Sequence, residues 1–402
     1  MRLHGKLLTG LLLLTVFCLA GCAFETSEKF GRGLGSKAEA EPKKVALMLP
    51  MHGRWSQESG QICKGVQGRF YKELQARPDR ELRLLDSSAA ATAILYHQAV
   101  DGGSEILIGP LTKTEIASVS DIAELTIPVL ALNNVELANY VPVKNLYYLG
   151  PSPESEVIQL TTRLEQDGLK RCALIVDGSK NSKRLAGLLE SHLARSDVRL
   201  SKLELSAQDN ISKRLCRFLS ADGSGNLCNA KMRKKMNTLS EEGASSLTRQ
   251  DLDAVILLAE PKVTAQLVPL LHFYYVEQLP ILSLSSGYDL DLSLADLEGL
   301  EFLDMPYAVR PAIVGELRDG ADDPHVHGAV GRSVNSSRSS ARRLYAVGAD
   351  AYWIASNFNR FMYNPSQMWE GASGKLRPIK GNLIFRQLSW IKVRGGKLEV
   401  ID

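Results

Sequence analysis

The feature that most constrains this chain is a regular alternation of short apolar runs with helical patterns, which residues 104–133 show most completely. Residues 106–108 (Ile-Leu-Ile) form a run typical of a strand buried on both faces. Gly109-Pro110 ends that run, apolar residues then recur at helical spacing, and Pro128 opens a second buried run. Strands that alternate with helices predict right-handed crossovers and a mostly parallel sheet.

The same alternation occurs twice along the chain. The first cycle extends from Lys43 to a Gly-Pro-Ser-Pro break at residues 150–153, where a second cycle begins. A chain of 402 residues is long enough for two such units, so we predict an α/β protein with two lobes, each a mostly parallel sheet flanked by helices. Residues 382–400 alternate around Gly395-Gly396 as in a β-hairpin. The predicted lobes comprise about 43–152 plus 341–363, and about 153–340 plus 375–402, within a domain of residues 43–402.

Loops at the carboxyl ends of parallel strands are where open α/β sheets bind their ligands. In a two-lobed protein we expect these edges of both sheets to border the cleft between the lobes. Small, polar or histidine side chains follow several of the predicted strands. The candidate cleft residues are His52, Gly53, Ser56, Gly109, Pro110, Thr112, Asn133, Ser152, Asp177 and Ser286.

Residues 1–21 have the pattern of a secretory signal. Two cations precede an apolar stretch, residues 7–19, which is too short to span a bilayer. Leu19-Ala20-Gly21-Cys22 follows and resembles the bacterial lipobox, in which the cysteine carries diacylglycerol and becomes the new N-terminus; an ordinary cleaved signal is the alternative. Ala23, in place of aspartate, predicts an anchor in the outer membrane that faces the periplasm. Residues 22–42 are polar and non-periodic, as in a flexible tether.

The remaining cysteines fall into two groups. Cys63 lies in a helical pattern and Cys172 in a strand pattern, so we expect both to be small core residues. Cys216 and Cys228 flank a Gly/Ser-rich turn, and in an oxidising compartment they are candidates for a disulfide. Zinc is the alternative, although no CxxC pair or accompanying histidine supports it.

The sequence contains no familiar catalytic signature. GxSxG, HExxH and GxxxxGK[ST] are all missing from it. His52 follows a predicted strand, where a structural role is the simpler interpretation. Residues 322–327 (Asp-Asp-Pro-His-Val-His) match a metal tract in composition only, because they lie in an irregular stretch. We therefore predict no enzymatic activity, no metal and no cofactor.

Charge excludes one class of partner. The formal net charge is +3, and removal of Arg2 and Lys6 with the signal leaves +1, which gives no global reason to bind nucleic acid. The basic run at residues 231–235 (Lys-Met-Arg-Lys-Lys) is most simply a solvated helix face. Its alternative is a docking patch for an acidic partner or an anionic envelope polymer.

Several motifs, in order along residues 43–402, resemble the penicillin-binding-protein activator family (LpoA-type outer-membrane lipoproteins). Their order and spacing carry the resemblance together. The motifs are residues 108–113 (IGPLTK), 128–133 (PVLALN), 152–156 (SPESE), 344–352 (LYAVGADAY), 373–374 (SG) and 388–390 (LSW).

The resemblance implies a type I periplasmic-binding-protein-like fold and a non-catalytic role. Members reach from the outer membrane to a class A penicillin-binding protein, a peptidoglycan synthase, and stimulate it; contact with peptidoglycan itself is a further expectation. Such activators commonly carry a helical-repeat domain before the two-lobed one, and here we expect only the tether, which extends roughly 70 Å at ~3.4 Å per residue.

The alternative function is a lipid-anchored solute-binding receptor of a transporter, for an amino acid or another small metabolite. Receptors of this fold typically hold their ligand with small hydroxyl residues after the third strand. Here Leu111-Thr112-Lys113-Thr114 stands at that position, with a bulky apolar side chain and a cation. The resemblance therefore favours an activator over a receptor.

Overall fold

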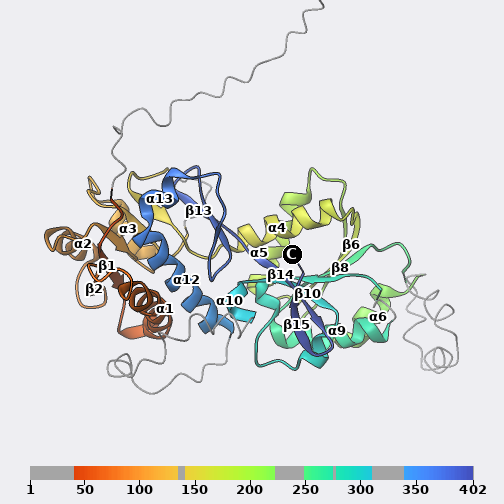
Figure 1. The fold of residues 1–402 in the computed structure, drawn as a ribbon. Coiled ribbons are helices and arrows are strands. Elements are labelled where there is room, and N and C mark those ends of the chain that lie inside the picture. Colours follow the sequence, from red (N-terminus) through yellow and green to blue (C-terminus); the bar gives the residue numbers. More distant parts are fainter. Residues whose placement is uncertain (1–39, 135–140, 222–248, 275–277, 310–338, 402) are drawn as a thin grey trace, which may run out of the picture. The chain divides into compact units, whose positions relative to one another are not determined.

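The structure, a computed structural model, describes residues 40–134, 141–221, 249–274, 278–309 and 339–401. These residues build two sheets, each flanked by helices (Figure 1). Most neighbouring strands pair in parallel, which confirms the predicted fold class. No helix among the described residues is both long and apolar enough to cross a membrane.

The first sheet has the strand order β11-β12-β13-β5-β4-β3-β1-β2. Along β1, Val45 and Leu47 join one buried cluster while Ala46 and Met48 join another, so both faces of the sheet are covered. This two-sided burial explains why the strand sequences are continuously apolar. The strands are β1 Lys44–Leu49, β2 Glu81–Asp86, β3 Ile106–Ile108, β4 Val129–Ala131, β5 Leu146–Tyr148, β11 Trp369–Glu370, β12 Lys375–Ile379 and β13 Leu383–Gln387.

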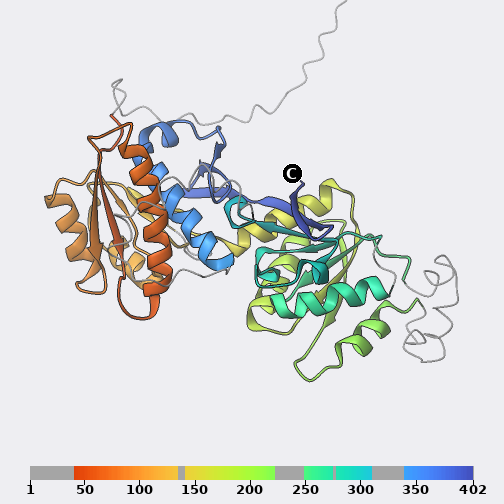
Figure 2. The same ribbon diagram turned by 60° about the horizontal axis from the view of Figure 1, so that its bottom comes forward.

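Two groups of helices cover the first sheet. α2 (Thr92–Asp101) and α3 (Lys113–Ser120) pack on one face, while α1 (Ser56–Leu74) packs on the other. α12 (Ser339–Ser356) runs beside α1 and is followed by α13 (Phe358–Tyr363) (Figures 1 and 2). Glycines permit this close approach, since a Cβ on Gly65 would lie 2.0 Å from the Tyr345 carbonyl oxygen and one on Gly348 2.1 Å from that of Ile62.

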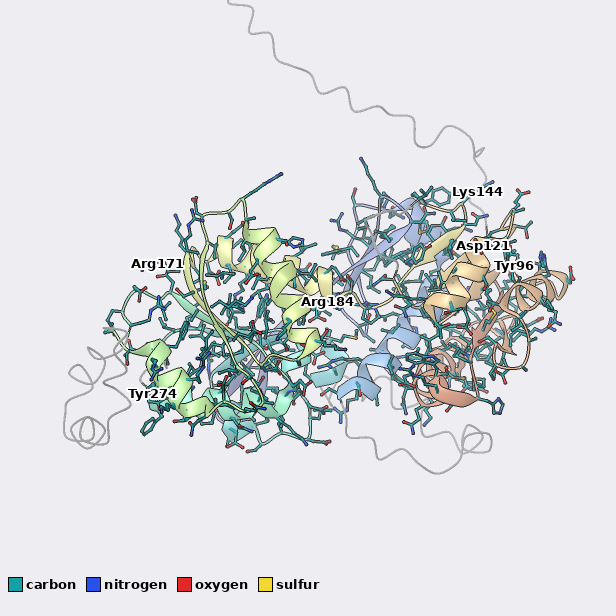
Figure 3. All side chains as sticks on the ribbon, turned by 180° about the vertical axis from the view of Figure 1, so that it is seen from behind. Tyr96, Asp121, Lys144, Arg171, Arg184 and Tyr274 are labelled. Carbon is teal, nitrogen blue, oxygen red and sulfur yellow. The ribbon has the colours of Figure 1, made fainter. Side chains whose placement is uncertain are left out.

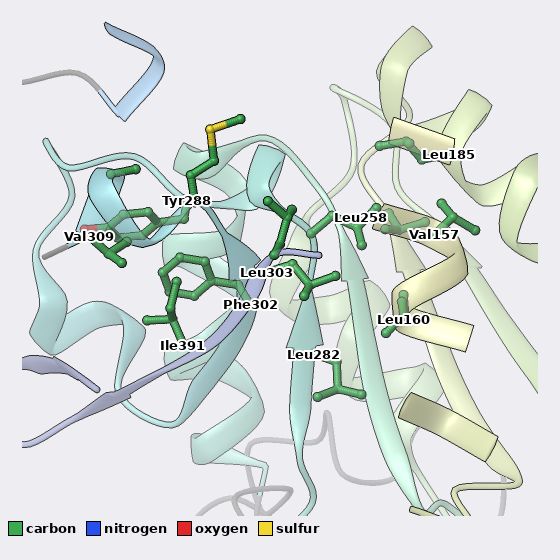
Figure 4. Close-up of a cluster of buried hydrophobic side chains, with 14 of the residues drawn as sticks. Val157, Leu160, Leu185, Leu258, Leu282, Tyr288, Phe302, Leu303, Val309 and Ile391 are labelled. Atoms are coloured by element: carbon green, nitrogen blue, oxygen red, sulfur yellow. The ribbon is translucent and has the colours of Figure 1, made fainter. Parts of the chain in front are cut away.

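The second sheet has the order β15-β14-β10-β9-β8-β6-β7. Tyr288 stacks on Phe302 of β10 at 4.4 Å between ring centroids, within the buried cluster of Figure 4. The strands are β6 Arg171–Val176, β7 Arg199–Glu204, β8 Ala254–Leu258, β9 Ile281–Ser283, β10 Leu300–Asp304, β14 Ser389–Arg394 and β15 Lys397–Val400. The helices are α4 Pro153–Gln166, α5 Lys180–Leu193, α6 Ile211–Leu219, α9 Pro261–Phe273 and α10 Pro306–Val309, with 3-10 turns η1 Gly53–Trp55, η4 Ser285–Gly287 and η5 Leu294–Leu297.

The C-terminal strands correct one prediction. Residues 375–402 were expected in the second lobe, but β12 and β13 extend the first sheet, where Leu383 pairs with Tyr148 of β5. Only β14 and β15 join the second sheet, and their antiparallel pairing around Gly395-Gly396 confirms the predicted hairpin. Alternation of side chains identifies a strand but does not specify which sheet it joins. A short helix, α6, follows β7.

Candidate functional site

The candidate cleft residues do lie in loops at the carboxyl edges of the two sheets, as their order after the strands requires. Two of them cap helices. The Thr112 hydroxyl accepts a hydrogen bond from the Glu115 amide at 3.3 Å, and the Glu115 carboxylate accepts one from the Thr112 amide at 2.9 Å. Ser152 caps α4 by accepting from the Ser155 amide at 3.2 Å. Both hydroxyls therefore satisfy helix termini that would otherwise bind water or a ligand.

Two further candidates connect neighbouring loops at the carboxyl edges of the sheets. The Asn133 side chain donates to the Leu111 carbonyl oxygen at 3.1 Å. The Asp177 carboxylate accepts hydrogen bonds from the Ser179 amide at 3.0 Å and the Glu260 amide at 2.6 Å. Burial raises the pKa of Asp177, but these hydrogen bonds outweigh it and the net pKa is lowered. These polar groups are occupied by backbone partners.

His52 is the most exposed of the candidates. Its imidazole Nδ1 lies 2.8 Å from the Asp86 carboxylate at the end of β2, and its side chain is 82% exposed. Partial burial raises the pKa of Asp86, yet hydrogen bonds from Ser88, the Met51 amide and His52 lower it well below its usual value. The pair orders the loop after β1. The Ser88 hydroxyl lies 3.3 Å from the same imidazole nitrogen and itself donates a hydrogen bond to the Asp86 carboxylate.

The other candidates have geometric roles. Gly109 has a φ of +99° and precedes a cis peptide bond to Pro110. A Cβ on Gly109 would lie 2.1 Å from the Met48 carbonyl oxygen, so a larger residue does not fit. Gly53 has a φ of +79° at the start of η1, Ser56 begins α1, and Ser286 lies half-buried in η4. These five residues therefore shape turns and the starts of helices.

The polar groups that do converge lie where the chain passes between the two sheets. The chain crosses from one sheet to the other after β5, after β10, and between β13 and β14. Only one residue, Leu388, separates β13 from β14. Gln159 of α4 holds the segment between β13 and β14 in place. Its side chain donates a hydrogen bond to the Arg386 carbonyl oxygen at 3.2 Å and accepts one from the Leu388 amide at 2.8 Å. A cavity of about 20 Å³ between Ser152, Glu156, Gln159, Met305, Arg386 and Leu388 has room for one water molecule.

A buried ion pair fixes the crossing that follows β10. Arg343 of α12 contacts both carboxylate oxygens of Asp304, at 2.7 and 2.6 Å, and donates to the Ser285 carbonyl oxygen at 2.9 Å. The Ser285 hydroxyl and amide donate to Glu156 of α4, at 2.8 and 2.9 Å. Burial raises the pKa of Glu156, and the hydrogen bonds from Ser285 oppose that rise. Four elements are joined through charge-assisted hydrogen bonds.

A second buried network connects α12 with β13. Asp350 of α12 accepts hydrogen bonds from the amides of Ala372 and Ser373, both at 2.7 Å, and from the Ser373 hydroxyl. Arg386 of β13 donates to that hydroxyl at 2.9 Å and to the Leu149 carbonyl oxygen at 2.8 Å. Burial raises the pKa of Asp350 and lowers the pKa of Arg386 to about 10, which leaves the guanidinium charged at neutral pH. These groups are hydrogen-bonded to one another and to the backbone at the crossings, so they stabilise the connection between the sheets.

Sequence reasoning missed this network as a site. Asp350 carried the available signal, because a carboxylate stands inside an apolar helical run, Ala346-Val347-Gly348-Ala349-Asp350-Ala351. Buried charges are rare unless they are paired, so such a residue predicts a partner. The partner itself, Ser373 with Arg386, is distant in the sequence and could not be named from it.

Other predictions fall partly outside the described residues. Cys22, the basic run 231–235, the tract 322–327 and Cys228 all lie there. Cys216 is disulfide-bonded, with a partner outside the described residues, so its pairing with Cys228 stays a prediction. Cys63 and Cys172 are buried free thiols, as expected of core residues. Among the residues described, no group of three or more His, Cys, Asp or Glu side chains is placed to hold a metal ion.

Comparison with known families decides the relationship. The family model of the LppC lipoproteins matches residues 34–396, which is most of the chain. The chain belongs to the LppC lipoprotein family. Within this family the sequence is 23% identical over 358 residues to the penicillin-binding protein activator LpoA of Photobacterium profundum, covering 87% of this chain and 56% of that protein. The chain thus spans about half the length of the curated relatives it matches.

Solved structures give the same fold. The LpoA C-domain from Haemophilus influenzae, described as a regulator of PBP1A, matches 89% of this LppC protein and all of that chain, with a TM-score of 0.63 and 19% identity. An ABC transporter substrate-binding protein from Desulfitobacterium hafniense matches 89% of this chain and 99% of its own, with a TM-score of 0.52 and 14% identity. The LppC protein therefore has the two-lobed architecture shared with periplasmic solute receptors.

Four of the six motifs that carry the family resemblance lie at or beside the crossings of this LppC protein, whereas residues 108–113 and 128–133 belong to β3, β4 and the loops that follow them. The motif 152–156 supplies the cap of α4 and Glu156, and the motif 344–352 supplies Asp350. Ser373 connects Asp350 to Arg386, and Leu388 is held by Gln159. These four motifs therefore contribute to the connection between the two sheets.

Proposed function

We propose that this LppC protein is an outer-membrane lipoprotein that binds and activates a class A penicillin-binding protein and so regulates peptidoglycan synthesis. The observation that carries the proposal is the family match across both lobes, to relatives named penicillin-binding protein activators. The solved LpoA C-domain of the same fold is described as a regulator of PBP1A. Activation of this kind requires no catalytic residue in the activator.

Its thermodynamic requirement is differential binding. An activator must bind the active state of the synthase more tightly than the inactive state. The difference between these two binding free energies sets how far the equilibrium between the two states of the synthase can shift. If the connection between the two lobes is rigid, the activator can favour the active state of the synthase without binding a ligand. The buried Arg343–Asp304 pair and the Asp350–Ser373–Arg386 network support a rigid joint of this type.

The membrane attachment belongs to the same proposal. Lipidation of Cys22 would place residues 22–42 as a tether between the outer membrane and the domain. The domain end of that tether is held, because Glu41 accepts hydrogen bonds from the amides of Asn359 and Arg360 at 3.0 and 2.8 Å, at the start of α13. The first lobe is therefore the part to which the tether transmits force.

The test is reconstitution of purified protein with a class A synthase. We expect saturable binding and a higher rate of glycan polymerisation and cross-linking. No binding and no stimulation at micromolar protein would contradict the proposal.

A solute receptor is the second candidate, favoured only by the fold shared with substrate-binding proteins. Thr112 and Ser152 are used by helix caps, and the cavity at the crossings accommodates one water. A metabolite that binds only the folded protein raises its stability by RT ln(1 + [L]/Kd). A thermal-shift screen over amino acids and other small metabolites that gives no shift counts heavily against the receptor.

A further inference from the structure

One edge of the first sheet carries both the entry of the chain into the domain and a group of exposed apolar side chains. The strands β1, β2, β3, β4, β5 and β13 are parallel, so their amino ends lie at the same edge, which we name the amino edge. The chain enters the domain there, because Glu41 shortly precedes β1. The crossings after β5 and β13 lie at the opposite, carboxyl edge.

Contacts connect the elements of the amino edge with one another. Asn382, which precedes β13, donates a hydrogen bond to the Val143 carbonyl oxygen in the loop before β5, at 2.8 Å. Tyr147 of β5 contacts Phe358 of α13 edge to face, with 5.2 Å between the ring centroids. Glu41 accepts its two backbone hydrogen bonds at the start of the same helix. The entering chain, α13 and the loops before β5 and β13 are therefore held together as one surface.

Three large apolar side chains are exposed on this surface. Val141, Tyr363 and Ile379 are 77%, 58% and 36% exposed, and the first two are the most exposed large apolar side chains among the described residues. Val141 precedes β5, Tyr363 precedes β11, and Ile379 ends the antiparallel strand β12, so the strand directions place all three at the amino edge. Lys144 and Lys380 are exposed at the same edge, and Figure 3 labels Lys144. Single exposed apolar residues are ordinary, whereas a group of them marks a contact surface.

We propose that the amino edge lies on the phospholipid surface of the membrane that holds the lipid anchor, with Val141, Tyr363 and Ile379 in its interface. The inference rests on the anchor of the proposed function, and it adds the contact surface and the orientation of the domain. Tyrosine favours the boundary between membrane and water, where lysine can reach phosphate groups while its stem lies along apolar surface.

The length of the chain before the domain supports this occupant over others. The 18 residues from Cys22 to Glu39 span at most roughly 60 Å at ~3.4 Å per residue. An anchor at Cys22 therefore keeps the amino edge, where the chain enters the domain, close to the bilayer. At the high local concentration that such a link creates, a contact suffices that is too weak to hold the protein without its anchor.

The test measures the distance between the amino edge and lipid in the lipidated protein, inserted in vesicles of phosphatidylethanolamine and phosphatidylglycerol. Ser366→Cys provides a site for a thiol-reactive dye on the exposed turn before β11, and Ser191→Cys is the matched control on α5 of the second lobe. Cys63 and Cys172 are buried. With doxyl-labelled phospholipid in the vesicles, we expect the dye at position 366 to be quenched at least about twofold more than the dye at position 191.

Neutral substitutions then test the apolar side chains without a change of charge. The surface variant combines Val141→Ser, Tyr363→Ser and Ile379→Ser. The control variant combines serine substitutions of three exposed apolar residues outside the amino edge, Leu84→Ser, Ile94→Ser and Ile158→Ser. We expect the surface variant to lose at least about half of the quenching at position 366, and the control variant to keep it.

The outcomes separate this inference from the proposed function. Equal quenching at the two dye positions, or quenching that the surface variant retains, overturns the inference while activation of the synthase stands. A synthase or a second copy of this chain on the amino edge would give that result, because either would keep lipid away from the dye. A protein that carries no acyl group in mass spectrometry overturns the inference together with the proposed anchor. If the surface variant melts at a lower temperature than the parent, the comparison of the two dye positions in the parent still decides.

Discussion

Arg343 of α12 donates two hydrogen bonds, of 2.7 and 2.6 Å, to the buried carboxylate of Asp304 at the end of β10. The Asp304 side chain is fully buried, and that of Arg343 is 19% exposed. The pair joins a helix that packs with the first sheet to the last parallel strand of the second. The pair therefore connects the two halves directly at this crossing.

Loss of one partner should be costly. We expect Asp304→Ala or Arg343→Met to lower the free energy of unfolding by about 3–5 kcal/mol, because each leaves an unpaired buried charge or donor. Arg394→Ala, which breaks the exposed pair with Glu399, should cost under about 1 kcal/mol. Urea denaturation measures both. Similar costs at the two sites would show that the buried pair has no special role.

The α1–α12 contact predicts a strong effect of a single methyl group. Gly65→Ala and Gly348→Ala place a Cβ against backbone oxygens at 2.0 and 2.1 Å, so the helices must separate. We expect a loss of about 1–3 kcal/mol or more for each.

Gly187→Ala in α5 is the matched control. Its Cβ meets nothing within 4 Å, and alanine should gain about 0.5–1 kcal/mol there because glycine loses more backbone entropy in a helix. Thermal melting of the three variants side by side measures the contrast; a neutral Gly65→Ala would argue against the close helix contact.

Asp86 predicts a dependence of stability on pH. Hydrogen bonds from Ser88, Met51 and His52 outweigh burial and hold its pKa below the ordinary value of 3.8. A lowered pKa in the folded state means that the unfolded chain binds the proton more readily, so the stabilisation is complete above pH 3.8 and declines as the pH falls further. The stability difference between the parent and Asp86→Asn should therefore be larger at pH 7 than at pH 3. A difference that is constant with pH would exclude this role.

Lipidation can be tested independently of the synthase. Cys22→Ala should release the protein from membranes, because the acyl chains that anchor it contribute ~0.8 kcal/mol per buried CH₂. Membrane fractionation with labelled fatty acid measures the outcome. Unchanged retention in the membrane would contradict an anchor at Cys22.

Much of the fold could be predicted because burial on both faces leaves continuous apolar runs. β1, β3, β6 and β8 are such runs, and β3 coincides with the strand predicted at residues 106–108. β12 and β13 show that such patterns do not specify which sheet a strand joins. Their alternation is the same as that of β14 and β15, and only the pairing of Leu383 with Tyr148 decides that they belong to the first sheet.

The site could be predicted less well, for a related reason. Thr112 and Glu115 stand at the spacing of a capping box, so local sequence accounts for their contact. Asp304 and Arg343 are 39 residues apart, and no periodicity connects them. Polar residues that follow strands were predicted to face a cleft, whereas the hydrogen bonds of Thr112 and Ser152 cap helices and those of Asn133 and Asp177 reach neighbouring loops.

The most direct test of the central claim is the activity of a purified class A synthase with and without this protein. We predict that the rate of peptidoglycan cross-linking rises with added protein and saturates. An unchanged synthase rate at micromolar protein, with no complex detected, would contradict the account.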